Sequence, residues 1–387
     1  LGDRYGHKRF FLFGMSVFSL GALLTALAPT IWLLLAARVL QGFGAAFLTS
    51  GALAIALAMF PTFKSAVVVG TWGAIGSLAA WLTPTAGSLV VERSWRVGFL
   101  LVVPFGLAAV VVGWRVLVEQ PVDRSRGPTD RLGCVLGPPA LGLLMLVLSR
   151  GGTWGWHSAQ TLLLGALVIA LLAAFAWRST VANSPLLDLE IVRNRRFAAN
   201  VVAGMFSQMG FYGWFLTAPI VMSGMWGWSI REIGFALALG QVLASVGSPL
   251  GGQLVVRFGP TTPIVLGALC CGLGMIWLVS TMSSTADFWS GYLPMALLLG
   301  FGGGMCGTVT TGAALAALPP QMLGAGNSVQ QLVRRMGGAL GVAFAVALLG
   351  EAPGPGLLAG ARRAWLFVAL IHFAMLIPAF VPRQRAR

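Results

Sequence analysis

The chain has 387 residues, of which 57% are hydrophobic and only 9% charged, and its net charge is +15. Soluble domains carry about 25% charged residues, so one water-soluble core could not bury this much apolar surface. A soluble enzyme, a secreted disulfide scaffold and a disordered chain are excluded, and a multi-pass membrane protein remains. The basic residues need not indicate nucleic-acid binding, and we expect none. The four cysteines lie in apolar stretches without a CxxC pair or a nearby histidine, so no metal site or disulfide is expected.

Twelve stretches are long and apolar enough to cross about 30 Å of hydrocarbon as helices. Backbone amides inside lipid must be satisfied within the segment, and the runs are too long for barrel strands. The sequence therefore predicts an all-α, polytopic membrane helix bundle. Its spans are expected at residues 10–28, 31–51, 65–91, 97–114, 132–149, 160–177, 197–223, 233–255, 262–281, 289–313, 324–349 and 364–381.

Basic residues are distributed unequally between the loops. If residue 1 is cytoplasmic, the inner loops hold sixteen Lys and Arg residues, and the outer loops hold six, among them Arg362 and Arg363. The positive-inside rule therefore places both ends of this chain in the cytoplasm. The scarcity of lysine beside arginine, with abundant Ala and Gly, is typical of a GC-rich bacterial genome, so we expect the cytoplasmic (inner) membrane of a bacterium.

Two long inner segments, 115–131 and 178–196, bracket the helix pair 132–149 and 160–177, which looks inserted between two larger groups. The domain organisation predicted from this pattern has three parts. They are the remainder of an N-terminal six-helix bundle at 1–118, central loops with two inserted helices at 119–196, and a C-terminal six-helix bundle at 197–387.

A short segment recurs at an offset of 253 residues, as LGDRYGH at 1–7 and LVVRFGP at 254–260. Related halves are a common plan of secondary transporters. Residues 1–9, LGDRYGHKR, resemble the loop between the second and third helices of the major facilitator superfamily. The resemblance implies that this loop is a cytoplasmic gating latch built from Asp3, Arg4, Gly6 and Arg9.

Residues 38–46, RVLQGFGAA, resemble the fourth-helix RxxQGxgaa motif of the same family. The resemblance implies that Arg38, Gln41 and Gly42 act in proton coupling or transport. An arginine in an apolar helix costs roughly 2.5–3.5 kcal/mol or more unless it snorkels or pairs, and all ten acidic residues lie in or beside loops. In the family the matching acid is on the first helix. We therefore expect two helices to precede Leu1, with twelve of fourteen spans present here.

Residues 73–104 resemble the antiporter helix GxxxGPxxGG and its WRWxFxxNxP exit. The match is partial, because two motif glycines are Thr83 and Ala86 and the usual Asn is Val102. Pro84 and Gly87 are expected to bend this helix and pack it closely, with Thr83 beside them. The match favours antiport, but a substrate importer stays open.

Residues 185–197, PLLDLEIVRNRRF, resemble a segment of the fourteen-span drug:proton antiporters of the EmrB/QacA type, and residues 334–341, RRMGGALG, resemble a late helix of that branch. The inserted helix pair is what separates this branch from twelve-span members. The resemblance covers the whole chain and implies a major facilitator fold with two extra central helices.

The second half carries further candidates. Gln208, Tyr212 and Trp214 could line a pocket for a large apolar cation, with ordinary packing as the alternative. Arg334 and Arg335 are intramembrane charges, and at least one should face a cavity or carbonyl oxygens. The glycine-rich run at 300–304 is interpreted as helix packing.

The resemblance implies a secondary active transporter that exports small amphipathic compounds or drugs by proton-coupled antiport and alternating access. Its expected partners are the substrate, protons and the lipid bilayer. The proton gradient is its energy source, with no cofactor and no enzymatic activity, and we expect a monomer. A transport-inactive fragment and a facilitator-type importer remain alternatives. A respiratory proton-pump subunit would need lysines at mid-membrane, and both lysines, Lys8 and Lys64, are in loops.

Overall fold

The structure is a computed structural model of the chain. It describes residues 6–59, 75, 76, 79, 82, 83, 86–92, 94–119, 130–182, 191, 193–285, 287–319, 322–350 and 355–379. Every regular element in these ranges is a helix, and the all-α prediction is confirmed. Nine of the described helices are long and apolar enough to cross a membrane.

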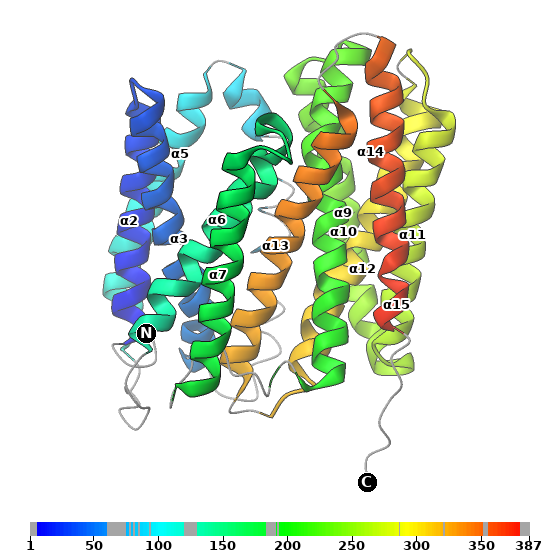
Figure 1. Ribbon diagram of the computed structural model, residues 1–387. Coiled ribbons are helices and arrows are strands. Elements are labelled where there is room, and N and C mark those ends of the chain that lie inside the picture. Colours follow the sequence, from blue (N-terminus) through cyan, green and yellow to red (C-terminus); the bar gives the residue numbers. More distant parts are fainter. Residues whose placement is uncertain are drawn as a thin grey trace. The chain divides into compact units, whose positions relative to one another are not determined.

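The chain divides into two compact units, Leu1–Pro128 and Thr129–Arg387. In the first unit, α2 (His7–Leu27) packs against both α3 (Ile31–Met59) and α5 (Trp95–Val116) (Figure 1). The span expected at 65–91 falls largely outside the described residues.

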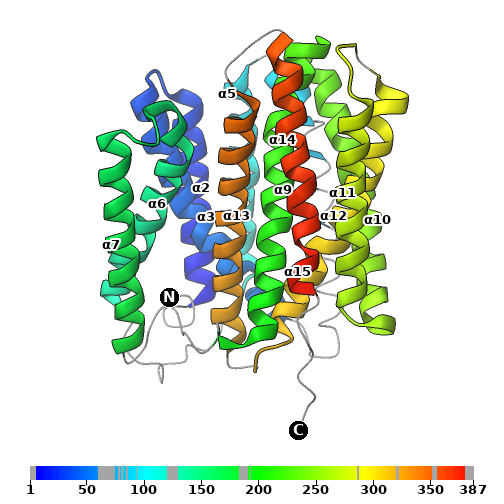
Figure 2. The same ribbon diagram turned by 45° about the vertical axis from the view of Figure 1, so that its right-hand side comes forward.

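The second unit begins with a helical hairpin. Its arms are α6 (Arg131–Trp154) and α7 (Ala159–Val181), and α6 lies beside α13 (Leu323–Leu349), as both ribbon views show (Figures 1 and 2). In this bundle α9 packs mainly against α13 and α14, and α12 packs against α10 and α11. The remaining elements are α9 (Arg195–Trp226), α10 (Ile230–Phe258), α11 (Thr261–Thr281), the π-helical turn η2 (Phe288–Tyr292), α12 (Leu293–Leu315), α14 (Pro355–Ala374) and α15 (Leu376–Ala379).

Polar residues at the ends of the apolar runs start several of these helices, among them α5, α6, α7, α9 and α10. The side chain of Asn194 accepts hydrogen bonds from the backbone N–H groups of Arg196 and Phe197. Ser229 and Glu232 form a reciprocal capping box at the start of α10. Such caps satisfy backbone donors that the first turn leaves without partners.

Every expected span except 65–91 overlaps a described helix.

The last long helix differs from its expected bounds. The sequence predicts a span at 364–381 with Arg362 and Arg363 in an outer loop, whereas α14 begins at Pro355 and includes both arginines. Their placement in a loop is wrong. Arg362 donates from Nη2 to the carbonyl oxygen of Met282, which ends α11, at 2.8 Å. This arginine therefore lies within the helix and has a partner next to the end of α11.

Glycines bring the helices of the second unit into close contact. A side chain on Gly300 or Gly304 would collide with the backbone of α10, and one on Gly302 would collide with α11. The interpretation of residues 300–304 as helix packing is confirmed. Small residues at crossings allow this approach in membrane bundles, where van der Waals contact drives association.

Candidate functional site

The start of α2 is held by a carboxylate from the end of its own unit. Glu119, which follows α5, accepts a hydrogen bond from the backbone N–H of Lys8 at 3.1 Å, and its other oxygen lies 3.8 Å from Nε of Arg9. The carboxylate therefore caps the positive end of the helix. Gly6 leaves room for the carboxylate, because a side chain at this position would collide with it. Its φ of 101° also lies in the left-handed region that favours glycine.

Two of the predicted latch residues, Gly6 and Arg9, thus meet at Glu119. Asp3 and Arg4 lie outside the described residues. The role of Glu119 was not predicted from the sequence, where it is one of the loop acids. Only its position shortly after an apolar helix could have indicated a contact with another helix end. The gating role of this loop stays a prediction.

Arg38 is exposed on α3 and has two contacts. Its Nη1 donates to Oε1 of Gln41 at 2.7 Å, and its guanidinium carbon lies 5.2 Å from the centre of the Phe99 ring on α5. No described carboxylate lies within ion-pair distance of it. That its carboxylate partner lies on a helix before Leu1 stays a prediction.

Gln41 and Gly42 occupy opposite environments. Gln41 is buried where α2 crosses α3, and a side chain on Gly21 would collide with its backbone. Gly42 is exposed, with open space where a side chain would extend. Gln41 therefore anchors Arg38 to the helix crossing, and Gly42 presents bare backbone beside it.

The predicted antiporter helix is described only in part. Thr83 is exposed and donates from its hydroxyl to the carbonyl oxygen of Ala79 at 2.7 Å. Gly87 is half-buried, and Pro84 lies outside the described residues. The role proposed for these residues stays a prediction.

The two intramembrane arginines of α13 have different surroundings. Arg334 is half-buried and donates from Nη1 to the hydroxyl of Thr311 at 2.6 Å and to the carbonyl oxygen of Gly307 at 3.3 Å, both on α12. Gly204 on α9 lies beside its stem. Arg335 is exposed and makes no hydrogen bond or ion pair within the described part of the chain.

A buried glutamine lies one turn before Arg334 on the same helix. Gln330 is 0% exposed, and neither atom of its amide has a hydrogen-bond partner among the described residues. Leaving a buried polar group unpaired costs about 1–3 kcal/mol. Its position, seven residues before Gly337, puts it on the face of α13 that contacts α9.

The three candidates on α9 separate into two environments. Trp214 is 3% exposed and belongs to the hydrophobic core of the second unit, so the packing alternative describes it. Tyr212 is 42% exposed and packs on Gly338 of α13, while Gln208 is half-buried. Gln208 lies one turn after Gly204 and one turn before Tyr212, on the same face of the helix.

Polar residues of three packed helices thus lie on the faces where those helices meet inside an apolar bundle. We call these residues the Arg334 cluster: Gln208 and Tyr212 on α9, Thr311 on α12, and Gln330 and Arg334 on α13. Polar and ionisable groups in membrane helices are costly and mark substrate or ion pathways. Sequence reasoning found three of the five but did not bring them together.

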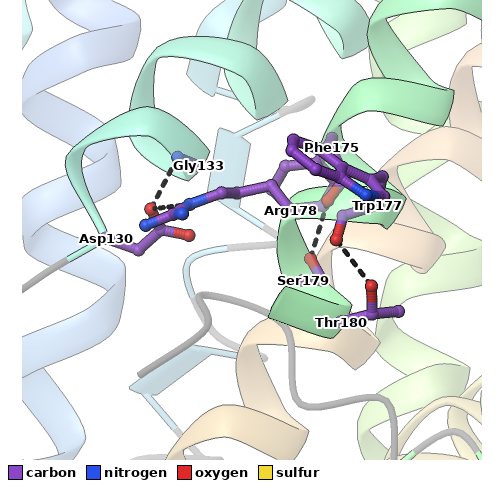
Figure 3. A network of polar contacts seen from close by, with 7 residues as sticks. All are labelled: Asp130, Gly133, Phe175, Trp177, Arg178, Ser179 and Thr180. Carbon is purple, nitrogen blue, oxygen red and sulfur yellow. Dashed lines mark hydrogen bonds and ion pairs between the residues drawn. The ribbon is translucent and has the colours of Figure 1, made fainter. Parts of the chain in front are cut away.

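A second polar contact ties the base of the α6/α7 hairpin (Figure 3). Asp130 accepts hydrogen bonds from the backbone N–H of Gly133 at 3.1 Å and from Nε of Arg178 at 2.9 Å. The Gly133 bond lowers the pKa of Asp130, and Arg178 lowers it further, while burial acts in the opposite direction. The sequence analysis placed both residues in loops and missed this pairing.

Comparison with known proteins gives related sequences. The chain is 30% identical to the tetracenomycin C resistance and export protein of Streptomyces glaucescens over 92% of its length and 66% of that protein. It is 30% identical to the multidrug resistance protein Stp of Mycobacterium tuberculosis over 89% of its length and 64% of that protein. It is 26% identical to the lincomycin resistance protein LmrB of Listeria monocytogenes over 85% of its length and 69% of that protein. The chain thus spans just under two thirds of the first two relatives.

Solved structures share the fold. A POT family transporter in complex with a thioalcohol-conjugated peptide superposes with a TM-score of 0.68 at 16% identity, covering 97% of this chain and 81% of that one. At this identity the likeness concerns the fold alone. The sequence pattern of the Major Facilitator Superfamily matches residues 1–342. With its helical membrane bundle and its relatives named for resistance and export, the chain belongs to the Major Facilitator Superfamily of transporters.

Proposed function

We propose that the protein is a secondary active exporter of the fourteen-span EmrB/QacA branch, which expels small amphipathic compounds or drugs by proton-coupled antiport and alternating access. Relatives named for drug resistance and export support the direction of transport. The α6/α7 hairpin and the segment at 185–197 support the branch, and with it the proposed parts 1–118, 119–196 and 197–387.

The observation that carries this proposal is the Arg334 cluster. Its guanidinium, two amides, phenol and the Thr311 hydroxyl lie within helices that are largely apolar, and they come from three different helices. A bundle that served only as a scaffold would gain stability from apolar residues at these positions. Retaining them fits a surface that binds a polar group of a substrate.

We also propose that transport is coupled to protons. This proposal rests on the resemblance of Arg38, Gln41 and Gly42 to the fourth-helix motif. An exposed guanidinium held by Gln41 and by an aromatic ring is positioned to pair with a carboxylate and lower its pKa. The carboxylate would then bind or release a proton as the transporter alternates between its inward-open and outward-open states.

Location and assembly follow from the charge distribution. We place the protein in the inner membrane of a bacterium, as a monomer with both ends of this chain in the cytoplasm, because the inner loops hold most of its basic residues. The start of α2, capped by Glu119, would then lie at the cytoplasmic surface as part of the gating latch.

Everted vesicles test the proposal. Vesicles from a bacterial strain without its own drug exporters, expressing the full-length protein that contains these 387 residues, are energised to an acidic interior. Ethidium, Nile red and carboxyfluorescein are offered outside as a cation, a neutral dye and an anion. We expect gradient-dependent uptake of at least one dye, abolished by nigericin and absent from vesicles with Arg38→Ala.

Two outcomes would contradict it. Uptake that proceeds equally well without the gradient would identify a facilitator, and the proton-coupled antiport would be wrong. No uptake above that of vesicles without the protein would contradict export altogether and favour the transport-inactive alternative.

A further inference from the structure

The Arg334 cluster is positively charged. We infer that it binds organic anions, so that the substrates are amphipathic aromatic acids rather than cations. This inference rests on the proposed export function for its consequence, although the binding site itself does not. It reverses the sequence-based expectation that Gln208 and Tyr212 serve a large apolar cation.

The charge of Arg334 has no carboxylate partner among the residues that the structure describes. Its two hydrogen-bond partners, the Thr311 hydroxyl and the Gly307 carbonyl, are neutral. Four of the acidic residues that the structure describes cap helices: Glu119, Asp130, Glu232 and Asp287. A fifth, Glu92, lies in the turn before α5. A cation arriving at this cluster would meet a guanidinium and no described carboxylate, whereas an anion would supply the missing partner.

The cluster also has free hydrogen-bond donors. Arg334 uses only Nη1 in its described bonds, so Nε and Nη2 remain available. A guanidinium offers paired N–H groups that match a carboxylate in two parallel bonds. The amide of Gln330, fully buried and without a partner in the described structure, adds N–H donors one turn away. A bound carboxylate would satisfy groups that are otherwise costly to bury.

The neighbouring surface is aromatic. The Tyr212 ring, 42% exposed, packs on Gly338, and Phe211 contacts both Tyr212 and Phe215, the latter in a stacked arrangement. Aromatic rings prefer offset-stacked or edge-to-face partners. A planar ring bearing an acidic group therefore fits both parts of the cluster, the ring on Tyr212 and the acid on Arg334. Arg335, the next residue of α13, is exposed and adds a second positive charge to this part of the helix.

The competing explanation is structural. In that explanation Arg334 merely ties α13 to α12 through Thr311, and Gln330 is a tolerated defect. The two explanations predict different affinities for ligands that share a shape but not a charge. They also predict different affinities for Gln330→Leu. Replacing an unpartnered buried amide with an apolar side chain should leave the fold intact in either case, but it should weaken anion binding only if the amide contacts the ligand.

The test uses three compounds with one ring system. The full chain is placed in nanodiscs of neutral phosphatidylcholine, and binding of 2-naphthoate, 2-naphthamide and 2-naphthylmethylammonium is measured by equilibrium dialysis, with empty nanodiscs as the blank. We expect naphthoate to bind about tenfold more tightly than the amide, and the ammonium compound to bind most weakly. Arg334→Gln should remove the preference for naphthoate, and Arg334→Lys should keep part of it.

Two variants complete the design. Gln330→Leu should weaken naphthoate binding several-fold while leaving binding of the amide unchanged, in a protein whose thermal stability is equal to or above that of the wild type. Arg257→Gln, which removes the same charge from the last turn of α10, should leave all three affinities unchanged. If Arg334→Gln fails to fold, the Lys and Leu variants decide.

Equal binding of the three compounds, a preference for the ammonium compound, absence of all binding, or an unchanged preference in Arg334→Gln would each overturn the inference. Its failure is distinguishable from failure of the proposed function. Gradient-driven uptake of dyes without a preference for naphthoate overturns the anion site alone. A preference for naphthoate without any uptake contradicts export alone.

Discussion

Two arginines lie in apolar helices of this protein, and their surroundings differ. Arg38 in the first unit is exposed, and its one hydrogen bond goes to a residue of its own helix, Gln41. Arg334 in the second unit is half-buried and bonds to a neighbouring helix. Arg38 can therefore change partners without disturbing the bundle, as a coupling residue must, whereas Arg334 is fixed in place, as a binding residue must be.

The largest effect is expected at Arg38. Arg38→Ala should abolish gradient-driven uptake in vesicles, while Arg38→Lys should keep part of it, because the charge stays but the fixed geometry is lost. The amount of protein inserted in the membrane should not change, since the Arg38 side chain is exposed and its described hydrogen bond stays within α3. Arg115→Ala, an exposed arginine near the end of α5, is the matched control. Normal uptake by Arg38→Ala would remove the distinction between the two arginines.

A smaller loss of transport is expected at Arg334. Arg334→Met should lower uptake about tenfold, yet change the free energy of unfolding by less than about 2 kcal/mol, because the Thr311 hydroxyl keeps its own bond to the Gly307 carbonyl. Arg335→Met should have a weaker effect on uptake. Transport assays with thermal unfolding in detergent measure both quantities. A large loss of stability with normal transport per folded molecule would make Arg334 a structural tie.

A pair of glycines tests how firmly Gln41 anchors Arg38. Gly21→Ala should destabilise the first unit by about 1–3 kcal/mol, because the added carbon would meet the Gln41 backbone at 2.7–2.8 Å. Gly42→Ala should change stability by less than about 0.5 kcal/mol, because its side chain would extend into open space. Equal stability of the two variants in thermal unfolding would contradict the described crossing of α2 and α3.

The smallest effect is expected at the base of the hairpin. Asparagine also caps helices well, so Asp130→Asn removes only the ion pair with Arg178, whereas Asp130→Ala removes the cap as well. We expect the melting temperature to fall by a few degrees in the Asn variant and by more in the Ala variant.

The pH dependence of that effect has a definite sign. Because the pKa of Asp130 is lowered in the folded chain, its stabilisation is fully present above the usual carboxyl value of about 3.9 and is lost as pH falls through the lowered value. The gap between wild type and Asp130→Asn should therefore be constant from about pH 5 to 8 and narrow below about pH 4. A gap that widens in acid would show that the pairing is wrong.

The helices were largely predictable, because a span is set by local apolar length. The error at α14 shows the limit of that rule. Arg362 was taken as the mark of a loop, but its partner, the Met282 carbonyl, lies 80 residues away and lets the helix continue. The glycines at 300–304 were interpreted correctly because small residues in a span have few other uses.

The contacts between polar groups were not predictable in the same way. Lys8 meets Glu119 across 111 residues, and Arg178 meets Asp130 across 48. Nothing in the local pattern pairs them, because such a bond depends on which helix ends come together. The sequence also left both a pocket and ordinary packing open for Trp214 and Tyr212, because it does not show which way each side chain faces.

The sequence by itself determined that this chain is a helical membrane protein with related motifs in a definite order, because hydrophobic length and loop charge act locally and do not depend on packing. Only the tertiary structure decided that Arg334 bonds to Thr311 and that the faces of α9 and α13 that carry Gln208, Tyr212 and Gln330 pack together. The rotation of each helix is set by close glycine contacts such as that of Gly341 with the Met209 backbone, and those contacts join residues far apart in the chain.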